Sequence, residues 1–142
     1  MKPSLLSAGA LVAALLVNAG CGHLALQAEG DPERVLTGTV NFHAAEPLPP
    51  DTVVTVRLID PAGPGGLPAM LGEKTIENPG SPPVAFKIEY RAEDDLLRRG
   101  LKLEARVSIG GKLRYYNVSG YGVTLAKAAD PQEIWVTLTG KE

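Results

Sequence analysis

The chain has 142 residues, with 14 Lys and Arg against 16 Asp and Glu, one Cys, 16 Gly and 12 Pro. Glycine and proline at this level disfavour a helical bundle, because neither is tolerated well inside helices. The formal charge of −2 gives no basic surface of the kind that binds nucleic acid. A single cysteine excludes a disulfide within the chain and a thiolate-rich metal cluster.

The first twenty residues are laid out like a signal peptide. Lys2 supplies the positive charge, and Leu5–Val17 is an apolar run of 13 residues. A transmembrane helix needs about 20 apolar residues, so the run is short for spanning a bilayer. Residues 1–20 are therefore predicted to be a signal peptide.

The segment Ala19-Gly20-Cys21 resembles the lipobox of bacterial lipoproteins, with Asn18 where that motif usually has Leu. The resemblance implies cleavage between Gly20 and Cys21, a diacylglyceryl group on the sulfur, and an N-acyl chain such as palmitate on the new amine. Gly22 is not Asp, which in Gram-negative lipoproteins favours sorting to the outer membrane. An ordinary secreted protein with a free thiol is the alternative.

Three regions follow from these observations: the signal peptide over residues 1–20, a lipidated tether over 21–33, and one domain over 34–142. Within the tether, Gly22–Pro32 comprises eleven residues. Fully extended, they reach roughly 35 Å.

Alternation of apolar and polar residues dominates the domain region and predicts short strands that each have one buried and one solvated face. The expected strands are Val35–His43, Thr52–Ile59, Lys74–Glu77, Val84–Tyr90, Leu101–Ile109, Lys112–Asn117, Gly122–Ala126 and Ile134–Thr139. The expected fold is all-β: an antiparallel, immunoglobulin-like β-sandwich of about seven or eight strands.

One helical connector and one tight hairpin are expected between strands. Ala92–Arg99 begins with acidic residues, ends with two arginines and is followed by Gly100, which suits the helix dipole and a glycine stop. Gly110-Gly111 predicts a two-residue hairpin turn, since both glycines accept positive φ.

Several segments together resemble YbaY-type lipoproteins, which are grouped with YscW-like type III secretion pilotins. The matching segments are Val35–Val40, Leu48–Asp51, Val53–Asp60, Pro83–Tyr90 and Leu103–Val107. The resemblance implies a periplasm-facing β-sandwich on a lipid anchor and carries over no enzymatic activity. Pilotin members escort a secretin subunit to the outer membrane, so a secretin is one implied partner.

No catalytic or metal-binding arrangement is found in the sequence. His23 and His43 lack metal-ligand spacing and an oriented partner, so both are interpreted as incidental surface residues. The acidic run Glu93–Asp95 fits a helix start better than a catalytic carboxylate pair. The sequence therefore predicts no enzyme, no catalytic residue and no cofactor other than the lipid on Cys21.

Two groups of side chains are candidates for binding a partner protein. Leu67, Met70 and Leu71 lie in an apolar loop, although Leu67 and Leu71 could instead cap the open end of the sandwich. Tyr116 is expected on the opposite strand face from its neighbour in the chain, and Trp135 is expected to point outward.

The leading hypothesis is a non-enzymatic outer-membrane lipoprotein of the cell envelope that binds or escorts another envelope protein. Two alternatives remain open at this stage. One is a sandwich that binds glycans or cell wall through Trp135, and the other is a housekeeping or stress lipoprotein.

Overall fold

The structure, a computed structural model, describes residues 33–44, 47–117 and 119–139. The predicted signal peptide, Cys21 and the predicted tether up to residue 32 lie outside the described residues. Glu33, expected as the last tether residue, is already the first residue of a strand.

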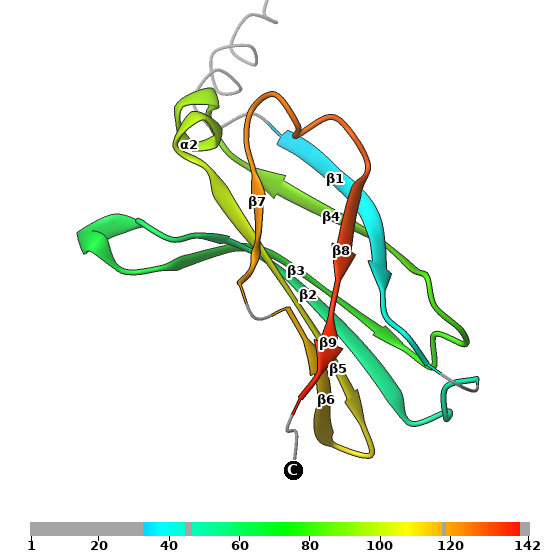
Figure 1. Cartoon of the computed structure of the whole chain (residues 1–142). Helices are drawn as coiled ribbons and strands as arrows, with labels where there is room; N and C mark the ends of the chain where they lie inside the picture. Colours follow the sequence, from blue (N-terminus) through cyan, green and yellow to red (C-terminus); the bar gives the residue numbers. More distant parts are fainter. Residues whose placement is uncertain (1–32, 45–46, 118, 140–142) are drawn as a thin grey trace, which may run out of the picture. The chain divides into compact units, whose positions relative to one another are not determined.

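The described residues form two sheets and one short α-helix, which confirms the expected all-β sandwich (Figure 1). The smaller sheet, sheet A, has the strand order β4-β1-β8. Its members are β1 (Glu33–Asn41), β4 (Val84–Arg91) and β8 (Gln132–Trp135). β1 pairs antiparallel with β4 and parallel with β8, so the expectation of a wholly antiparallel sandwich is wrong for this one pair.

The larger sheet, sheet B, has the strand order β3-β2-β5-β6-β9, and β7 pairs with β5 off this path. Its members are β2 (Thr52–Asp60), β3 (Ala69–Glu77), β5 (Leu101–Ile109), β6 (Lys112–Tyr116), β7 (Tyr121–Val123) and β9 (Thr137–Leu138). All pairings described within this sheet are antiparallel.

The core lies between the sheets and consists of the inward-facing half of each alternating strand. The largest fully buried side chains are Leu36, Leu58, Ile88, Leu97, Leu103 and Ile134. Leu97 comes from the helix, α2 (Asp94–Arg99), which therefore covers part of the core besides connecting β4 to β5.

The two sheets approach each other closely at β3 and β4. A Cβ atom added at Gly72 of β3 would lie 2.5 Å from Cγ2 of Ile88 in β4 and 3.3 Å from the carbonyl oxygen of Glu89. On the opposite side the chain passes directly from sheet A to sheet B, because Val136 lies between β8 and β9. Glycine at position 72 is thus required by the contact between the sheets.

The single strand expected over Ile134–Thr139 is therefore wrong. It is divided at Val136 into β8 and β9, which belong to different sheets. Leu138, expected on the same buried face as Ile134, is 64% exposed because β9 is the edge strand of sheet B.

Two other strands differ from the sequence prediction by three residues or more at one end. β3 starts at Ala69 rather than Lys74, because its hairpin with β2 continues to the pair Asp60 and Ala69. β7 ends at Val123, since the chain then turns with a hydrogen bond from the Lys127 N–H to the Thr124 carbonyl at 3.0 Å. The predicted glycine hairpin is confirmed, with φ of 60° at Gly110 and 82° at Gly111.

One end of the sandwich gathers the start of β1, the end of β2 and α2. The Arg34 Nε of β1 donates to the carbonyl oxygen of Ala92 at 2.7 Å, and its guanidinium also pairs with Asp94. Arg99 of α2 lies 3.8 Å from the carboxylate of Asp60. Among the described helices, none has the length and hydropathy needed to cross a membrane.

Tyr90 is buried beneath this end, and its hydroxyl finds no hydrogen-bond partner among the described residues. Burial raises the pKa of Tyr90, and the positive charge of Arg34 offsets part of that increase. A raised pKa means that the unfolded chain ionises first, so this group's contribution to stability is lost as the pH rises above about 10.

We therefore expect Tyr90→Phe to keep or raise the free energy of unfolding by about 1 kcal/mol at neutral pH, because an unpaired buried hydroxyl is removed. The variant should also lose less stability than the parent between about pH 7 and about pH 11. Urea unfolding at both pH values measures this. A large loss of stability at neutral pH would show that the hydroxyl has a partner after all.

Candidate partner-binding site

Trp135 lies on the outer face of sheet A, at the exposed edge strand β8, as the sequence predicted for its orientation. Its side chain is 51% exposed and is the most exposed large aromatic side chain among the described residues. The ring lies 5.2 Å from the ring of His43, centroid to centroid, and its Nε1 donates to Oε1 of Glu133 at 3.2 Å. These two contacts hold the ring in one orientation without burying it, which reduces the entropy lost on binding.

The backbone of β8 has one unpaired edge. The N–H of Val136 donates to the carbonyl of Asn41 in β1 at 3.0 Å. Because peptide groups alternate in direction along a strand, those of Glu133 and Trp135 point away from β1. In the described part of the chain no strand pairs with them. They can exchange hydrogen bonds with a partner segment.

A hollow of about 170 Å³ lies beside this edge. It is lined by Asn117, Ser119, Gly120, Tyr121, Ile134, Trp135 and Thr137. The volume is enough for a large apolar side chain. The lining residues come from both sheets, because the hollow is placed where the chain crosses from β8 to β9.

Asn117 fixes one wall of this hollow. Its Oδ1 accepts a hydrogen bond from the Ala105 N–H at 2.8 Å, and its Nδ2 donates to the Leu103 carbonyl at 2.9 Å. The side chain therefore replaces a neighbouring strand for β5 at the point where β6 has ended and β7 has not begun. The wall is pre-formed, as sites that bind a partner without reorganisation require.

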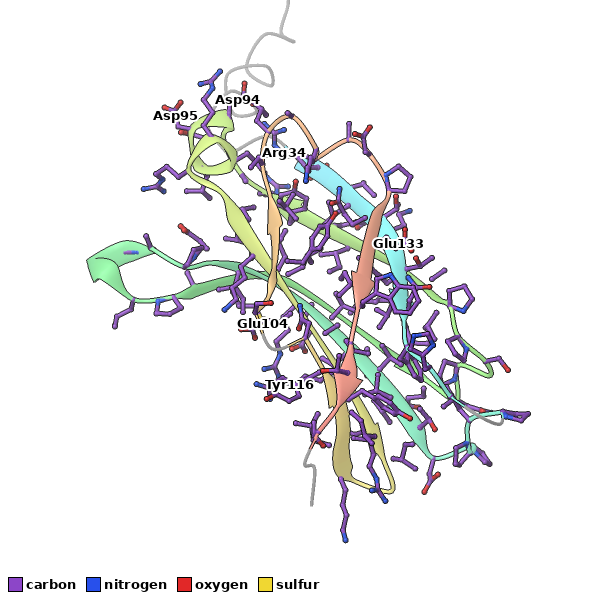
Figure 2. The ribbon with its side chains drawn as sticks, in the orientation of Figure 1. Arg34, Asp94, Asp95, Glu104, Tyr116 and Glu133 are labelled. Carbon is purple, nitrogen blue, oxygen red and sulfur yellow. The ribbon has the colours of Figure 1, made fainter. Side chains whose placement is uncertain are left out.

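Tyr116 is not one of the residues that line the hollow, although it pairs with Thr137, which is. It is 37% exposed and pairs with Arg106 on the outer face of sheet B. Trp135 lies on the outer face of sheet A, so the two rings do not form one patch; Figure 2 shows Tyr116 well apart from Glu133, the partner of the Trp135 indole. The neighbouring Tyr115 packs against the core, and its ring centroid lies 4.9 Å from that of Phe42, which confirms that the two tyrosines face opposite ways.

Leu67, Met70 and Leu71 are placed in the hairpin between β2 and β3 and not beside Trp135. Leu67 is 68% and Met70 59% exposed, so the suggestion that Leu67 caps the sandwich is wrong. Leu71 is half-buried and packs against the core. The structure thus separates the sequence candidates into three regions: the Trp135 hollow, Tyr116 on sheet B, and the β2–β3 hairpin.

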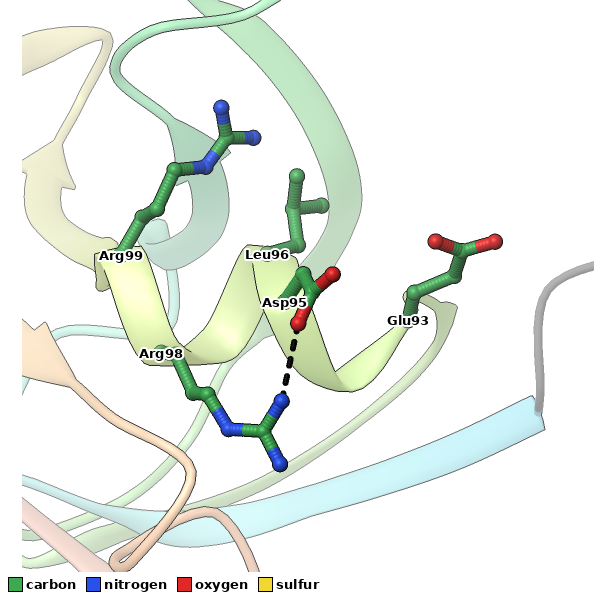
Figure 3. Close-up of a pocket in the computed structure, with 5 residues that line it drawn as sticks. All are labelled: Glu93, Asp95, Leu96, Arg98 and Arg99. Atoms are coloured by element: carbon green, nitrogen blue, oxygen red, sulfur yellow. Dashed lines mark hydrogen bonds and ion pairs between the residues drawn. The ribbon is translucent and has the colours of Figure 1, made fainter.

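A larger depression of about 680 Å³ lies against α2 (Figure 3), but its chemistry is poor for binding. It is lined by Glu93, Asp95, Leu96, Arg98 and Arg99, all on one short surface segment. Arg98 is already paired with Asp95 at 2.8 Å, and both are exposed. Solvent-exposed pairs of this kind contribute little, and they are typical of an ordinary helix surface.

Comparison with known proteins identifies the class of this fold. A family model described as type III secretion system lipoprotein chaperone (YscW) matches residues 31–136, most of the chain, and the chain belongs to that family. This confirms the resemblance to YscW-like pilotins.

A solved structure, an alternative pilotin from the type II secretion system of Vibrio cholerae, has the same fold with a TM-score of 0.63. It is 23% identical, and the match covers 78% of this chain and 100% of that one. No curated protein sequence matches this chain significantly.

Proposed function

We propose that this protein is a pilotin-like lipoprotein of the cell envelope, which binds a secretin-class subunit and escorts it to the outer membrane without catalysing a reaction. Membership of the YscW family over residues 31–136 is the observation that carries the proposal. The family is described as a chaperone. That role needs a surface that binds the partner and a feature that localises the protein, and it needs no reacting groups.

The lipid on Cys21 determines the membrane location of the protein. Cleavage after Gly20 would leave Cys21 as the first residue, with acyl chains on its sulfur and its amine. Gly22, which is not Asp, favours transfer to the outer membrane and a periplasm-facing domain. The eleven residues between Cys21 and Glu33 reach roughly 35 Å when fully extended, which limits how far the domain can lie from the bilayer.

The binding surface is the hollow beside β8. An apolar side chain of the partner enters the hollow and packs against Trp135, while the free peptide groups of Glu133 and Trp135 bind its backbone. Glu133, exposed at the rim, favours a basic residue next to that apolar side chain. Burial of an aromatic anchor within a ring of polar contacts is the usual arrangement of an energetic hot spot.

Trp135→Ala is expected to weaken partner binding by at least about 2 kcal/mol, roughly 30-fold in Kd, with little change in folding. Tyr116→Ala is the matched control, since it removes an exposed aromatic ring from the other sheet. The measurement is the affinity for the partner secretin subunit, together with the unfolding curve of each variant. Equal effects from both variants would show that the Trp135 hollow is not the site.

In cells, deletion of the gene is expected to leave a secretin outside the outer membrane. Restoring the parent chain should return the secretin, and restoring the Trp135→Ala variant should not. Membrane fractionation followed by detection of assembled secretin measures this. A secretin that assembles normally in the deletion strain would contradict the proposal.

A further inference from the structure

The hairpin between β2 and β3 ends in an uncharged arm, which we define as residues 61–72. The sequence of the arm contains no charged side chain, yet it exposes Leu67 and Met70 to solvent. Figure 1 shows this hairpin extending away from the rest of sheet B. Since neither side chain contributes to the core, folding of the domain does not explain the apolar surface of the arm.

The arm is held in a defined shape by its own sequence. Pro64 starts the short 3₁₀ helix η1 (Pro64–Gly66), and the Gly66 N–H donates to the Gly63 carbonyl at 2.9 Å. At the base, Oδ1 of Asp60 accepts a hydrogen bond from the Ala62 N–H at 3.1 Å, and Leu71 packs against the core. Leu67 is therefore presented on a supported turn and is not a side chain of a loose loop.

The arm begins at the end of the sandwich where the chain enters the domain. Its base, Asp60, lies 3.8 Å from Arg99 of α2, and Arg34 at the start of β1 pairs with Asp94 of the same helix. Eleven residues connect Cys21 to Glu33, a reach of roughly 35 Å when fully extended. A lipid on Cys21 would hold this end of the domain, and with it the arm, close to the bilayer.

We infer that the arm lies on the membrane, with Leu67 and Met70 inserted among the lipid headgroups. The inference rests on the proposed lipid anchor at Cys21. A phospholipid surface is the occupant that fits an arm of apolar, proline and glycine residues, because such a surface needs no matching charge or directional hydrogen bond. Two apolar side chains bind a bilayer weakly alone, but an anchor makes the contact intramolecular at high effective concentration.

The consequence is a fixed orientation of the domain. With both the anchor and the arm on the bilayer, the domain cannot rotate freely about its tether. The Trp135 hollow would then be presented at a constant height and direction to a partner arriving at the same membrane. Lipid contact is thus a positioning device in addition to an anchor.

The test uses the full-length lipidated protein in vesicles of phosphatidylethanolamine and phosphatidylglycerol that contain no other protein. Cys21 is the only cysteine, so its lipidation leaves Leu67→Cys as the single site for an environment-sensitive dye. The matched control is Lys112→Cys, in the exposed hairpin at the other end of β5. We expect blue-shifted emission and quenching by headgroup-labelled lipids for the dye at position 67, and neither for the dye at position 112.

The Met70→Cys variant gives a second reporter in case the dye at position 67 disturbs the turn. Unchanged emission at both arm positions, in protein whose mass shows the acyl chains, would overturn the inference and leave the proposed anchor intact. A mass that shows no acyl chains on the protein would overturn both the inference and the proposed lipid anchor. If the emission of the dye on the arm changes in native membranes but not in protein-free vesicles, the arm binds a protein. That result also contradicts the inference.

Discussion

Replacing Cys21 by Ser is expected to release the protein from the membrane into the soluble periplasmic fraction. Each buried CH₂ of an acyl chain contributes about 0.8 kcal/mol to membrane binding, so loss of several chains removes nearly all of the affinity. Any contact by Leu67 and Met70 is too small to replace it. Fractionation followed by an alkaline wash of the membranes measures the change, and labelled palmitate should disappear from the variant.

Gly22→Asp is the matched control for the Cys21 experiment. It keeps the cysteine and the proposed lipid but introduces the residue that disfavours outer-membrane sorting in Gram-negative lipoproteins. The variant is expected to stay in the membrane fraction and move to the inner membrane. If Cys21→Ser instead remained in alkali-washed membranes, lipidation would not be the cause of membrane association. The pilotin-like proposal would then have no explanation for the membrane location of the protein.

Alternation along the sequence predicts which residues are buried but not which strands are neighbours. Val84–Tyr90 and Leu101–Ile109 alternate cleanly and lie in β4 and β5 with the expected faces inward. The parallel pairing of β1 with β8 depends on where the chain returns after β7, which is a long-range property. The division of the predicted last strand at Val136 likewise cannot be seen in the sequence, because apolar and polar residues keep alternating where the strand passes from one sheet to the other.

The candidate site could be predicted only in part for the same reason. An outward orientation of Trp135 follows from its place in an alternating run and holds in the structure. The hollow beside Trp135 forms because residues around Asn117 lie next to β8. No local pattern in either segment predicts that these two segments are neighbours. His43 is exposed, as expected of a surface residue, but its contact with the Trp135 ring, 5.2 Å between centroids, follows from no local pattern in the sequence.

Gly38 connects the stability of the fold to the proposed site. An added Cβ atom there would lie 2.3 Å from the carbonyl oxygen of Gln132 in β8 and 2.9 Å from the ring of Phe86. Gln132 cannot yield freely, because its side-chain amide donates to the carbonyls of Lys127 at 2.7 Å and Asp130 at 2.6 Å. Only glycine therefore allows β8 to pair with β1 in this register.

We expect Gly38→Ala to lower the free energy of unfolding by about 3 kcal/mol, the upper part of the usual range for overpacked cores. Gly122→Ala is the matched control, since Gly122 is also a strand glycine but no atom lies within 4 Å of its added Cβ. That control is expected to change stability by no more than about 0.5 kcal/mol. Urea unfolding of both variants measures the difference.

Displacement of β8 should also move Trp135 and open the hollow, so Gly38→Ala is expected to weaken partner binding under conditions where the domain is still folded. Gly122→Ala should bind like the parent chain. A Gly38→Ala protein that is destabilised but binds normally would place the partner away from β8. Equal stability of the two alanine variants would instead show that a methyl group at position 38 is accommodated between β1 and β8.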